Sequence, residues 1–155
     1  MIVAIDPSMH CSGVAVFKED HKLVDYFNVH VPTTKSGGDA IIMMTKKVFV
    51  ETPSDISALV VEVQNPRGAN ERMSKQDLMN LHAVCYSILC KVAEPKTICR
   101  PVYPFDWNRG VPKKIMHNRM ADKYGISRMP GPEDYLDAVG IGDYYIRSKR
   151  GKCVG

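Results

Sequence analysis

The first residues of the chain form an apolar run that stops at an acid and then turns sharply. Ile2 to Ile5 lead into Asp6-Pro7-Ser8, and Val14 to Phe17 form a second apolar run after Ser12-Gly13. Proline, serine and glycine between two such runs are typical of a tight connection between neighbouring strands. A carboxylate at the end of a strand buried on both faces is costly without a compensating partner. Asp6 therefore needs a partner, and the usual one is a cation.

Composition limits the class of protein. With 155 residues and 45% apolar content, the chain suits one domain over residues 1–155, with a basic tail from about residue 147. The net charge of +4 is compatible with a polyanionic partner. Asp6 interrupts the apolar start too early for a signal peptide, and no apolar stretch approaches the length of a membrane span. Five cysteines without a CxxC pair indicate reduced thiols, so we expect an intracellular protein.

Hydrophobic periodicity predicts three further strands and three helices. The strands are expected at Lys22–Val31, Ser57–Val63 and Thr97–Tyr103. The helices are expected at Asp39–Glu51, Ser74–Val92 and Glu133 to about Arg147, and Trp107–Lys123 is expected to be part helix and part loop. The order βββαβαβα predicts an α/β fold in which a mixed five-stranded sheet carries helices on both faces.

A second acid interrupts another apolar strand. Glu62 follows Leu59, Val60 and Val61, so its carboxylate has no obvious solvent exposure. If this strand lies beside the first one and parallel to it, Asp6 and Glu62 converge at one edge of the sheet. Gln64, two residues later, projects to the same face as Glu62.

The last predicted helix adds two acids, Asp134 and Asp137, whose spacing of three places them on one helix face. Each acid has an ordinary alternative. Glu133 and Asp134 could be acids that favour a helix N-terminus, and Asp6 could cap a turn. Taken together, however, four such carboxylates suit a pair of Mg²⁺ or Mn²⁺ ions, and two ions about 4 Å apart can promote phosphodiester cleavage.

These segments resemble a known family. Asp6-Pro7-Ser8 with Ser12-Gly13, the Glu62 strand, Arg119-Met-Ala-Asp-Lys123 and Asp134-x-x-Asp137-Ala138 are similar in order and spacing to the RuvC-type Holliday junction resolvases of the ribonuclease H-like superfamily. The resemblance spans nearly the whole chain. It implies a sheet in the order 3-2-1-4-5 and a homodimeric, metal-dependent endonuclease that nicks four-way DNA junctions.

The resemblance also assigns residues. It implies that Asp6, Glu62, Asp134 and Asp137 hold two Mg²⁺ (or Mn²⁺) ions. The family's basic residues near the scissile phosphate correspond to Lys113 or Lys114, and to Lys123.

One departure concerns the residues after Glu62. Bacterial members carry an aromatic residue there, which they use against bases at the junction, whereas this chain reads Gln64-Asn65-Pro66-Arg67. We therefore do not expect the bacterial cleavage-sequence preference. The pattern Glu62-x-Gln64-x-x-Arg67 is closer to the mitochondrial and the phage or poxvirus branches. A phage member would work in the cytoplasm or nucleoid of its host.

Basic residues concentrate between Arg100 and Arg128, where seven Lys or Arg stand against two Asp. Tyr103 and Trp107 lie in the same stretch, which suits phosphate contacts beside a stacking platform. The alternative is an ordinary solvated surface. The residues expected to contact DNA are Gln64, Arg67, Arg72, Lys75, Trp107, Arg109, Lys114, Arg119 and Arg128.

Three minor points complete the sequence-based hypothesis. His10 and Cys11 lie near Asp6, and we expect a structural or surface role for His10 and a packing role for Cys11. A ribonuclease H-like nuclease that acts on RNA or RNA–DNA hybrids is a second possible enzyme. A nucleic-acid-binding module without catalysis is a third possibility, although the presence of all four acids argues against it.

Overall fold

The computed structural model describes residues 1–64, 74–92 and 96–150. Its sheet has the order β3-β2-β1-β4-β5, which confirms the predicted α/β topology. β1 pairs antiparallel with β2 and parallel with β4, so the strands that end in Asp6 and Glu62 are neighbours that point the same way. The strands are β1 (Ile2–Asp6), β2 (Cys11–Phe17), β3 (Leu23–His30), β4 (Ala58–Glu62) and β5 (Ile98–Val102).

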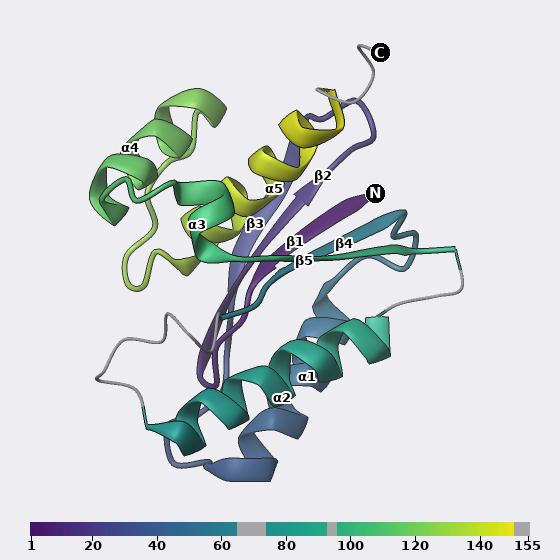
Figure 1. Ribbon diagram of the computed structural model, residues 1–155, viewed down its shortest axis with the longest axis vertical. Coiled ribbons are helices and arrows are strands. Elements are labelled where there is room, and N and C mark those ends of the chain that lie inside the picture. The colour runs from purple at the N-terminus through teal and green to yellow at the C-terminus, as the bar shows by residue number, and fades with distance from the viewer. Residues whose placement is uncertain (65–73, 93–95, 151–155) are drawn as a thin grey trace.

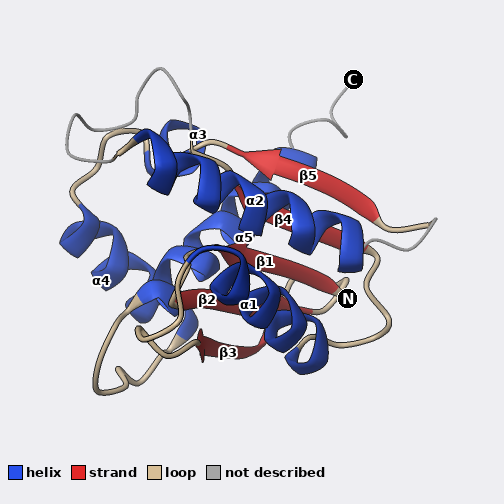
Figure 2. Ribbon diagram, turned by 90° about the horizontal axis from the view of Figure 1, so that it is seen from below, coloured by secondary structure: helices blue, strands red, loops and turns tan. Residues whose placement is uncertain are grey.

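Helices cover both faces of the sheet (Figures 1 and 2). α1 (Gly37–Glu51) and α2 (Lys75–Val92) lie on one face, and α5 (Asp134–Arg150) lies on the other with α3 (Pro104–Asn108) and α4 (Lys113–Tyr124) beside it. α5 continues past the predicted end at Arg147, so the start of the expected basic tail is helical. Among the described helices, none is long and apolar enough to cross a membrane.

The alternation of side chains along β1 and β4 determines the face of the sheet on which Asp6 and Glu62 lie. Ile2 and Ala4 pack on the α5 face, as do Ala58 and Val60, whereas the intervening residues of both strands pack on the α1 and α2 face. Successive side chains in a strand point to opposite faces. Asp6 and Glu62 therefore continue the α5 side of each strand.

The basic segment forms two short helices because the backbone is interrupted between them. α3 begins with Pro104 at its first position and ends at Asn108, and the next residue, Arg109, has a left-handed φ of 50°. α4 follows Pro112 and ends at Tyr124, and the next residue, Gly125, is also left-handed, with φ 63°. Glycine adopts this conformation without the steric penalty that a side chain brings, which explains the helix end at this point.

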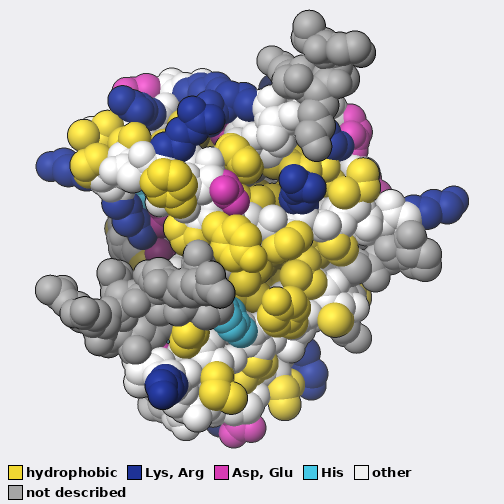
Figure 3. Space-filling model, viewed as in Figure 1, with side chains coloured by type: hydrophobic (Ala, Val, Ile, Leu, Met, Phe, Trp, Pro, Cys, Tyr) yellow, Lys and Arg dark blue, Asp and Glu magenta, His cyan; other side chains and the backbone are white. Residues whose placement is uncertain are grey.

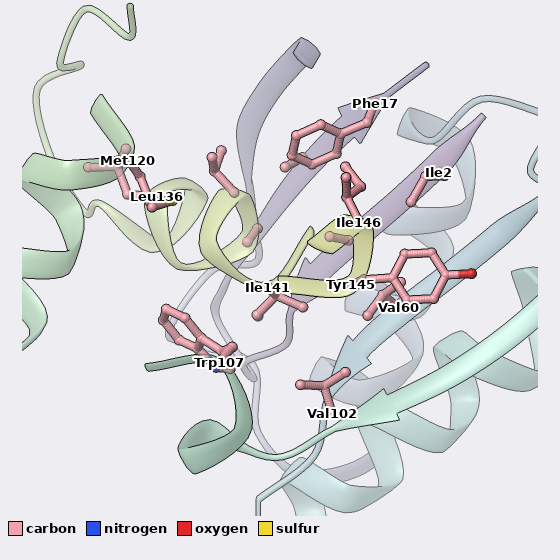
Figure 4. Packing of buried hydrophobic residues seen from close by; sticks show 14 of the residues in the cluster. Ile2, Phe17, Val60, Val102, Trp107, Met120, Leu136, Ile141, Tyr145 and Ile146 are labelled. Atoms are coloured by element: carbon pink, nitrogen blue, oxygen red, sulfur yellow. The ribbon is translucent and has the colours of Figure 1, made fainter. Parts of the chain in front are cut away.

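α5 is buried on nearly all sides between the sheet and the pair α3 and α4. Its residues 135–143 are buried, and the surrounding core includes Ile2, Phe17, Val60 and Trp107 (Figure 4). Two glycines of α5 permit this close packing, because a Cβ at Gly142 would lie 2.2 Å from the Phe17 ring, and one at Gly140 would lie 2.7 Å from the Trp107 ring.

The tightest approach joins β2 to the beginning of α5. A Cβ at Gly13 would lie 2.0 Å from the backbone oxygen of Asp134 and 2.2 Å from its carbonyl carbon. Backbone atoms cannot move aside as a flexible side chain can, so only glycine fits this position. Gly13 thereby sets the distance between the sheet and the first turn of α5.

Gly13→Ala should destabilise the protein by about 1–3 kcal/mol, because the added methyl group forces α5 away from β2. Urea denaturation measures this loss. The matched control is Gly38→Ala in α1, where a Cβ meets nothing within 4 Å and the substitution should stabilise the helix by about 0.5–1 kcal/mol. Equal stabilities of the Gly13 variant and the unsubstituted protein would contradict this account.

Candidate active site

The turn after β1 is held by a serine pair. The Ser12 hydroxyl accepts a hydrogen bond from the backbone N–H of Ser8 at 2.9 Å and donates one to the Ser8 carbonyl at 3.1 Å. Ser12 is fully buried. The Asp6-Pro7-Ser8 and Ser12-Gly13 motif therefore has a structural basis. The two serines close the turn beside Asp6, and Gly13 leaves room for the backbone of α5 to pack closely.

Three carboxylates meet between β1 and the first turns of α5. Asp6, Asp134 and Asp137 each offer an oxygen, and these oxygens all lie within 4.8 Å of one another. Burial, followed by the charges of Glu62, Asp137 and Asp134, raises the pKa of Asp6 well above its ordinary value. The structure therefore brings three of the four predicted acids together.

Glu62 lies beside this group but is not part of it. Its Oε2 accepts a hydrogen bond from the Trp107 indole N–H at 2.5 Å, and its Oε1 accepts one from the Gln64 amide at 2.8 Å. The side chain is buried. Burial raises the pKa of Glu62 to about 7. The hydrogen bond from Trp107 acts in the opposite direction, and the charge of Asp137 raises the pKa further.

Lys113, the first residue of α4, supplies positive charge to the acids. Its Nζ lies 2.5 Å from Asp137 Oδ2 and 3.8 Å from Asp134 Oδ1. Burial opposes the charged lysine, but the hydrogen bond to Asp137 and the nearby carboxylates raise its pKa overall. Of the two lysines that the sequence left open, Lys113 is the one that contacts the acids. Lys114 lines only an adjoining hollow, which Lys113 also lines.

The sequence analysis missed His117, which is almost completely buried at 3% exposure. Its Nε2 lies 2.8 Å from Asp137 Oδ1, and its Nδ1 lies 3.1 Å from Glu133 Oε2. Burial alone would lower the pKa of His117, but the contacts with the two carboxylates raise it overall. The available signal was its position four residues after Lys113, which places both side chains on one face of α4.

Cys11 also contacts the group. Burial of its thiol, followed by interaction with the Asp134 side chain and the nearby charges, raises the pKa of Cys11 to about 12. A thiol with so high a pKa stays protonated at neutral pH and is a poor nucleophile. The expectation of a structural role for Cys11 therefore agrees with its surroundings.

Asp6, Glu62 and Asp137 open on a cleft of about 460 Å³. Its wall is formed by Asp6, Glu62, Gln64, Pro104, Trp107, Asn108, Val111, Lys113, Met116 and Asp137. Carboxylate oxygens are the ligands that Mg²⁺ and Mn²⁺ prefer, and clustered carboxylates with raised pKa values gain most from a cation. The three close acids, with Glu62 beside them, thus have the chemistry of a divalent metal site.

Lys123 does not reach the acid group, contrary to the role expected for it. Its Nζ lies 2.5 Å from Asp143 Oδ1, and the buried Asp143 carboxylate also contacts the Tyr124 hydroxyl and the Arg147 guanidinium. Lys113 and Lys123 stand ten residues apart on α4, a separation of about 15 Å along the helix. One straight helix therefore cannot bring both lysines to the same carboxylates.

Trp107 is not an exposed stacking platform, so that prediction was wrong. Its side chain is buried, with the ring against Gly140 and the N–H on Glu62. The exposed aromatics of this stretch are Tyr103 and Phe105, which are 47% and 73% exposed. They flank Pro104, which lines the cleft.

The other residues expected to contact DNA fall into separate groups. Arg109 and Arg119 are exposed and line a second hollow of about 400 Å³ on the far side of Trp107, together with Lys123 and Arg147. Figure 3 shows that Lys and Arg side chains gather around α4 and α5 on this side of the molecule. Lys75 is exposed at the start of α2. Arg67 and Arg72 lie outside the described residues.

In sequence comparisons, no protein-family model and no curated protein matches the chain. Solved structures do match. The structure of Thermus thermophilus RuvC in complex with Holliday junction substrate has a TM-score of 0.71 at 16% identity, over 96% of both chains, as has a second structure of Thermus thermophilus RuvC. The chain has the fold of the RuvC-type resolvases. Fowlpox virus resolvase, in complex with Holliday junction DNA, aligns with a TM-score of 0.64 at 13% identity, over 96% of this chain and 99% of that one.

Glu62→Gln should stabilise the metal-free protein at pH 8 by about 2–3 kcal/mol. In the folded protein the pKa of Glu62 is about 7, above the ordinary 4.5, so Glu62 keeps its proton to a higher pH than it does in the unfolded chain. The free energy of unfolding should therefore fall as pH rises from about 4.5 to 7, and the variant should lack this contribution. Urea denaturation in a chelator at pH 5 and pH 8 measures the difference, which should be small at pH 5.

The matched control is Asp122→Asn, which removes one negative charge from an exposed position of α4. It should leave stability unchanged within about 0.5 kcal/mol at both pH values. A Glu62→Gln variant no more stable than the unsubstituted protein at pH 8 would show that the buried carboxylate carries no such penalty.

Proposed function

We propose that this protein is an endonuclease that nicks Holliday junctions or other branched DNA by metal-dependent phosphodiester hydrolysis. The observation that carries the proposal is the group of Asp6, Asp134 and Asp137 oxygens within 4.8 Å of one another. Asp6 and Asp137 lie on the wall of a cleft that Glu62 and Lys113 also line. Likeness of fold to two resolvases solved with Holliday junction DNA supports the choice of substrate.

The residues of the chain divide the work. Asp6, Glu62, Asp134 and Asp137 would hold two Mg²⁺ or Mn²⁺ ions, which activate water and stabilise the departing oxygen when they are bound. Lys113 places a positive charge at the same cleft, where a phosphodiester needs neutralisation. Trp107 and Gln64 fix the orientation of the Glu62 carboxylate through its two oxygens.

The exposed basic residues would follow the DNA backbone. Lys114 and Arg128 lie on one side of the cleft, and Arg109 and Arg119 lie beyond Trp107 on the other. Contacts of Lys and Arg with phosphates supply affinity without sequence selectivity. A branched substrate has several arms, so basic surfaces on both sides of the cleft suit it better than they suit one straight duplex.

Paired nicks require two sites, and we propose that a homodimer provides them. α2 is the interface that we expect. Met79 and Tyr86 are 65% and 57% exposed and stand seven residues apart, which places both on one face of the helix. Exposed apolar side chains on one helix face are typical of a surface that another chain covers.

Asp6→Asn should abolish junction cleavage in Mg²⁺, a loss on the order of 10³-fold or more, while junction binding persists. The substitution removes a ligand oxygen charge but leaves the basic surfaces intact. Cleavage of a labelled four-way junction and a gel-shift titration in Ca²⁺ measure the two properties. Asp25→Asn, an exposed acid of β3, is the control and should cut normally. Unimpaired cutting by the Asp6 variant would refute the site assignment.

The choice of substrate is tested with the unsubstituted protein. A four-way junction, a linear duplex and an RNA–DNA hybrid of matched sequence are offered side by side with Mg²⁺ and with Mn²⁺. Preference for the hybrid would favour the alternative ribonuclease H-like nuclease. Binding without cleavage of any substrate in either metal would favour a non-catalytic nucleic-acid-binding module.

Phe105→Ala should weaken binding of the branched substrate by about 1–3 kcal/mol, the usual contribution of an aromatic ring that stacks on a base. Phe105 is 73% exposed beside the cleft, and the ring contributes little to the core. Gel-shift titration measures the change. Val50→Ala, an exposed apolar residue of α1 on the opposite face of the sheet, should have no effect. Unchanged binding by the Phe105 variant would exclude stacking at this position.

A further inference from the structure

We propose that His117 and Glu133 form a positioning pair that fixes the Asp137 carboxylate for metal binding. This inference rests on the proposed function, since it assigns Asp137 to a metal. Its starting point is that each oxygen of Asp137 has a different partner on α4. Lys113 Nζ lies 2.5 Å from Oδ2, and His117 Nε2 lies 2.8 Å from Oδ1.

The two partners differ in their freedom to move. The Lys113 side chain is 62% exposed, whereas that of His117 is 3% exposed. A cation entering the acid group takes over the charge that Lys113 supplies to Asp137, and this exposed lysine can then turn away from Asp137 while it remains at the cleft. His117 is enclosed by the protein and stays. Oδ2 is therefore the oxygen that Asp137 can offer to a metal, while Oδ1 remains held.

Glu133 fixes the histidine ring from its other side. Glu133 Oε2 lies 3.1 Å from His117 Nδ1, and Oε1 lies 3.1 Å from the Arg128 guanidinium. The contacts form a continuous series from Arg128 through Glu133 and His117 to Asp137. Both ring nitrogens are thus occupied, which leaves the ring one orientation.

Attachment of α4 to α5 does not by itself explain this arrangement. Lys123 already joins the far end of α4 to Asp143 of α5, and the Met116 and Met120 side chains pack in the shared core. A buried histidine between two carboxylates adds something specific, because it restrains the carboxylate that the metal needs. Groups that orient metal ligands in this way commonly change metal affinity by about 10- to 100-fold when removed.

The test is a titration of the DNA-free protein with Mn²⁺, in which electron paramagnetic resonance and calorimetry measure binding. His117→Ala should weaken Mn²⁺ binding by about 10- to 100-fold. His117→Gln keeps an N–H donor for Asp137 and should recover most of the affinity. Glu133→Ala, which frees the ring, should produce a smaller loss. His30→Ala, an exposed histidine of β3, is the control and should bind as the unsubstituted protein does.

A second measurement separates positioning from damage to the fold. The Mg²⁺ concentration at half-maximal junction cleavage should rise for His117→Ala, while the junction dissociation constant in Ca²⁺ stays the same. If His117→Ala does not fold, the Mn²⁺ affinities of His117→Gln and Glu133→Ala test the inference instead. Normal Mn²⁺ affinity in Glu133→Ala would show that Glu133 does not position His117. Folded His117→Ala with normal Mn²⁺ affinity would overturn the inference alone. Absence of Mn²⁺ binding by the unsubstituted protein would instead refute the proposed function.

Discussion

The close approach of α5 to β2 at Gly13 is the constraint on which the candidate site depends. The backbone of Asp134 lies where any side chain at residue 13 would stand. Because α5 starts at this contact, its first turns lie directly over the end of β1, and Asp134 and Asp137 meet Asp6. A helix displaced by the width of a methyl group would open that group of carboxylates. The geometry of the site is thus set by a backbone contact rather than by the acids themselves.

The acids are held together against their own electrostatics. Burial and mutual repulsion raise the pKa of Asp6, and burial raises that of Glu62 to about 7. Such a group costs stability in a metal-free protein and gains from any cation that enters it. Lys113 reduces the cost without removing it, because its side chain remains largely exposed. The same repulsion that weakens the fold therefore favours metal binding.

The sequence predicted what depends on local pattern and strand alternation. Apolar runs located β1 and β4, and the assumption that these strands are parallel neighbours brought Asp6 and Glu62 to one edge of the sheet. Contacts between segments far apart in the sequence could not be predicted in this way. His117 and Asp143 are buried because α4 packs on α5, which no local pattern of the basic segment reveals. The same segment suggested an exposed Trp107, since a charged stretch does not indicate which of its members faces inward. Its ring instead fills the space above Gly140.

The location of Trp107 has a practical consequence. It is the single tryptophan of the chain, and its indole N–H contacts one oxygen of a carboxylate whose pKa is about 7. Indole emission responds to the charge and polarity close to the ring. The tryptophan fluorescence of the protein thus comes from a single indole, in contact with Glu62. Protonation of that carboxylate, or binding of a metal ion to it, should therefore change the tryptophan emission, which can be measured without a label or a substrate.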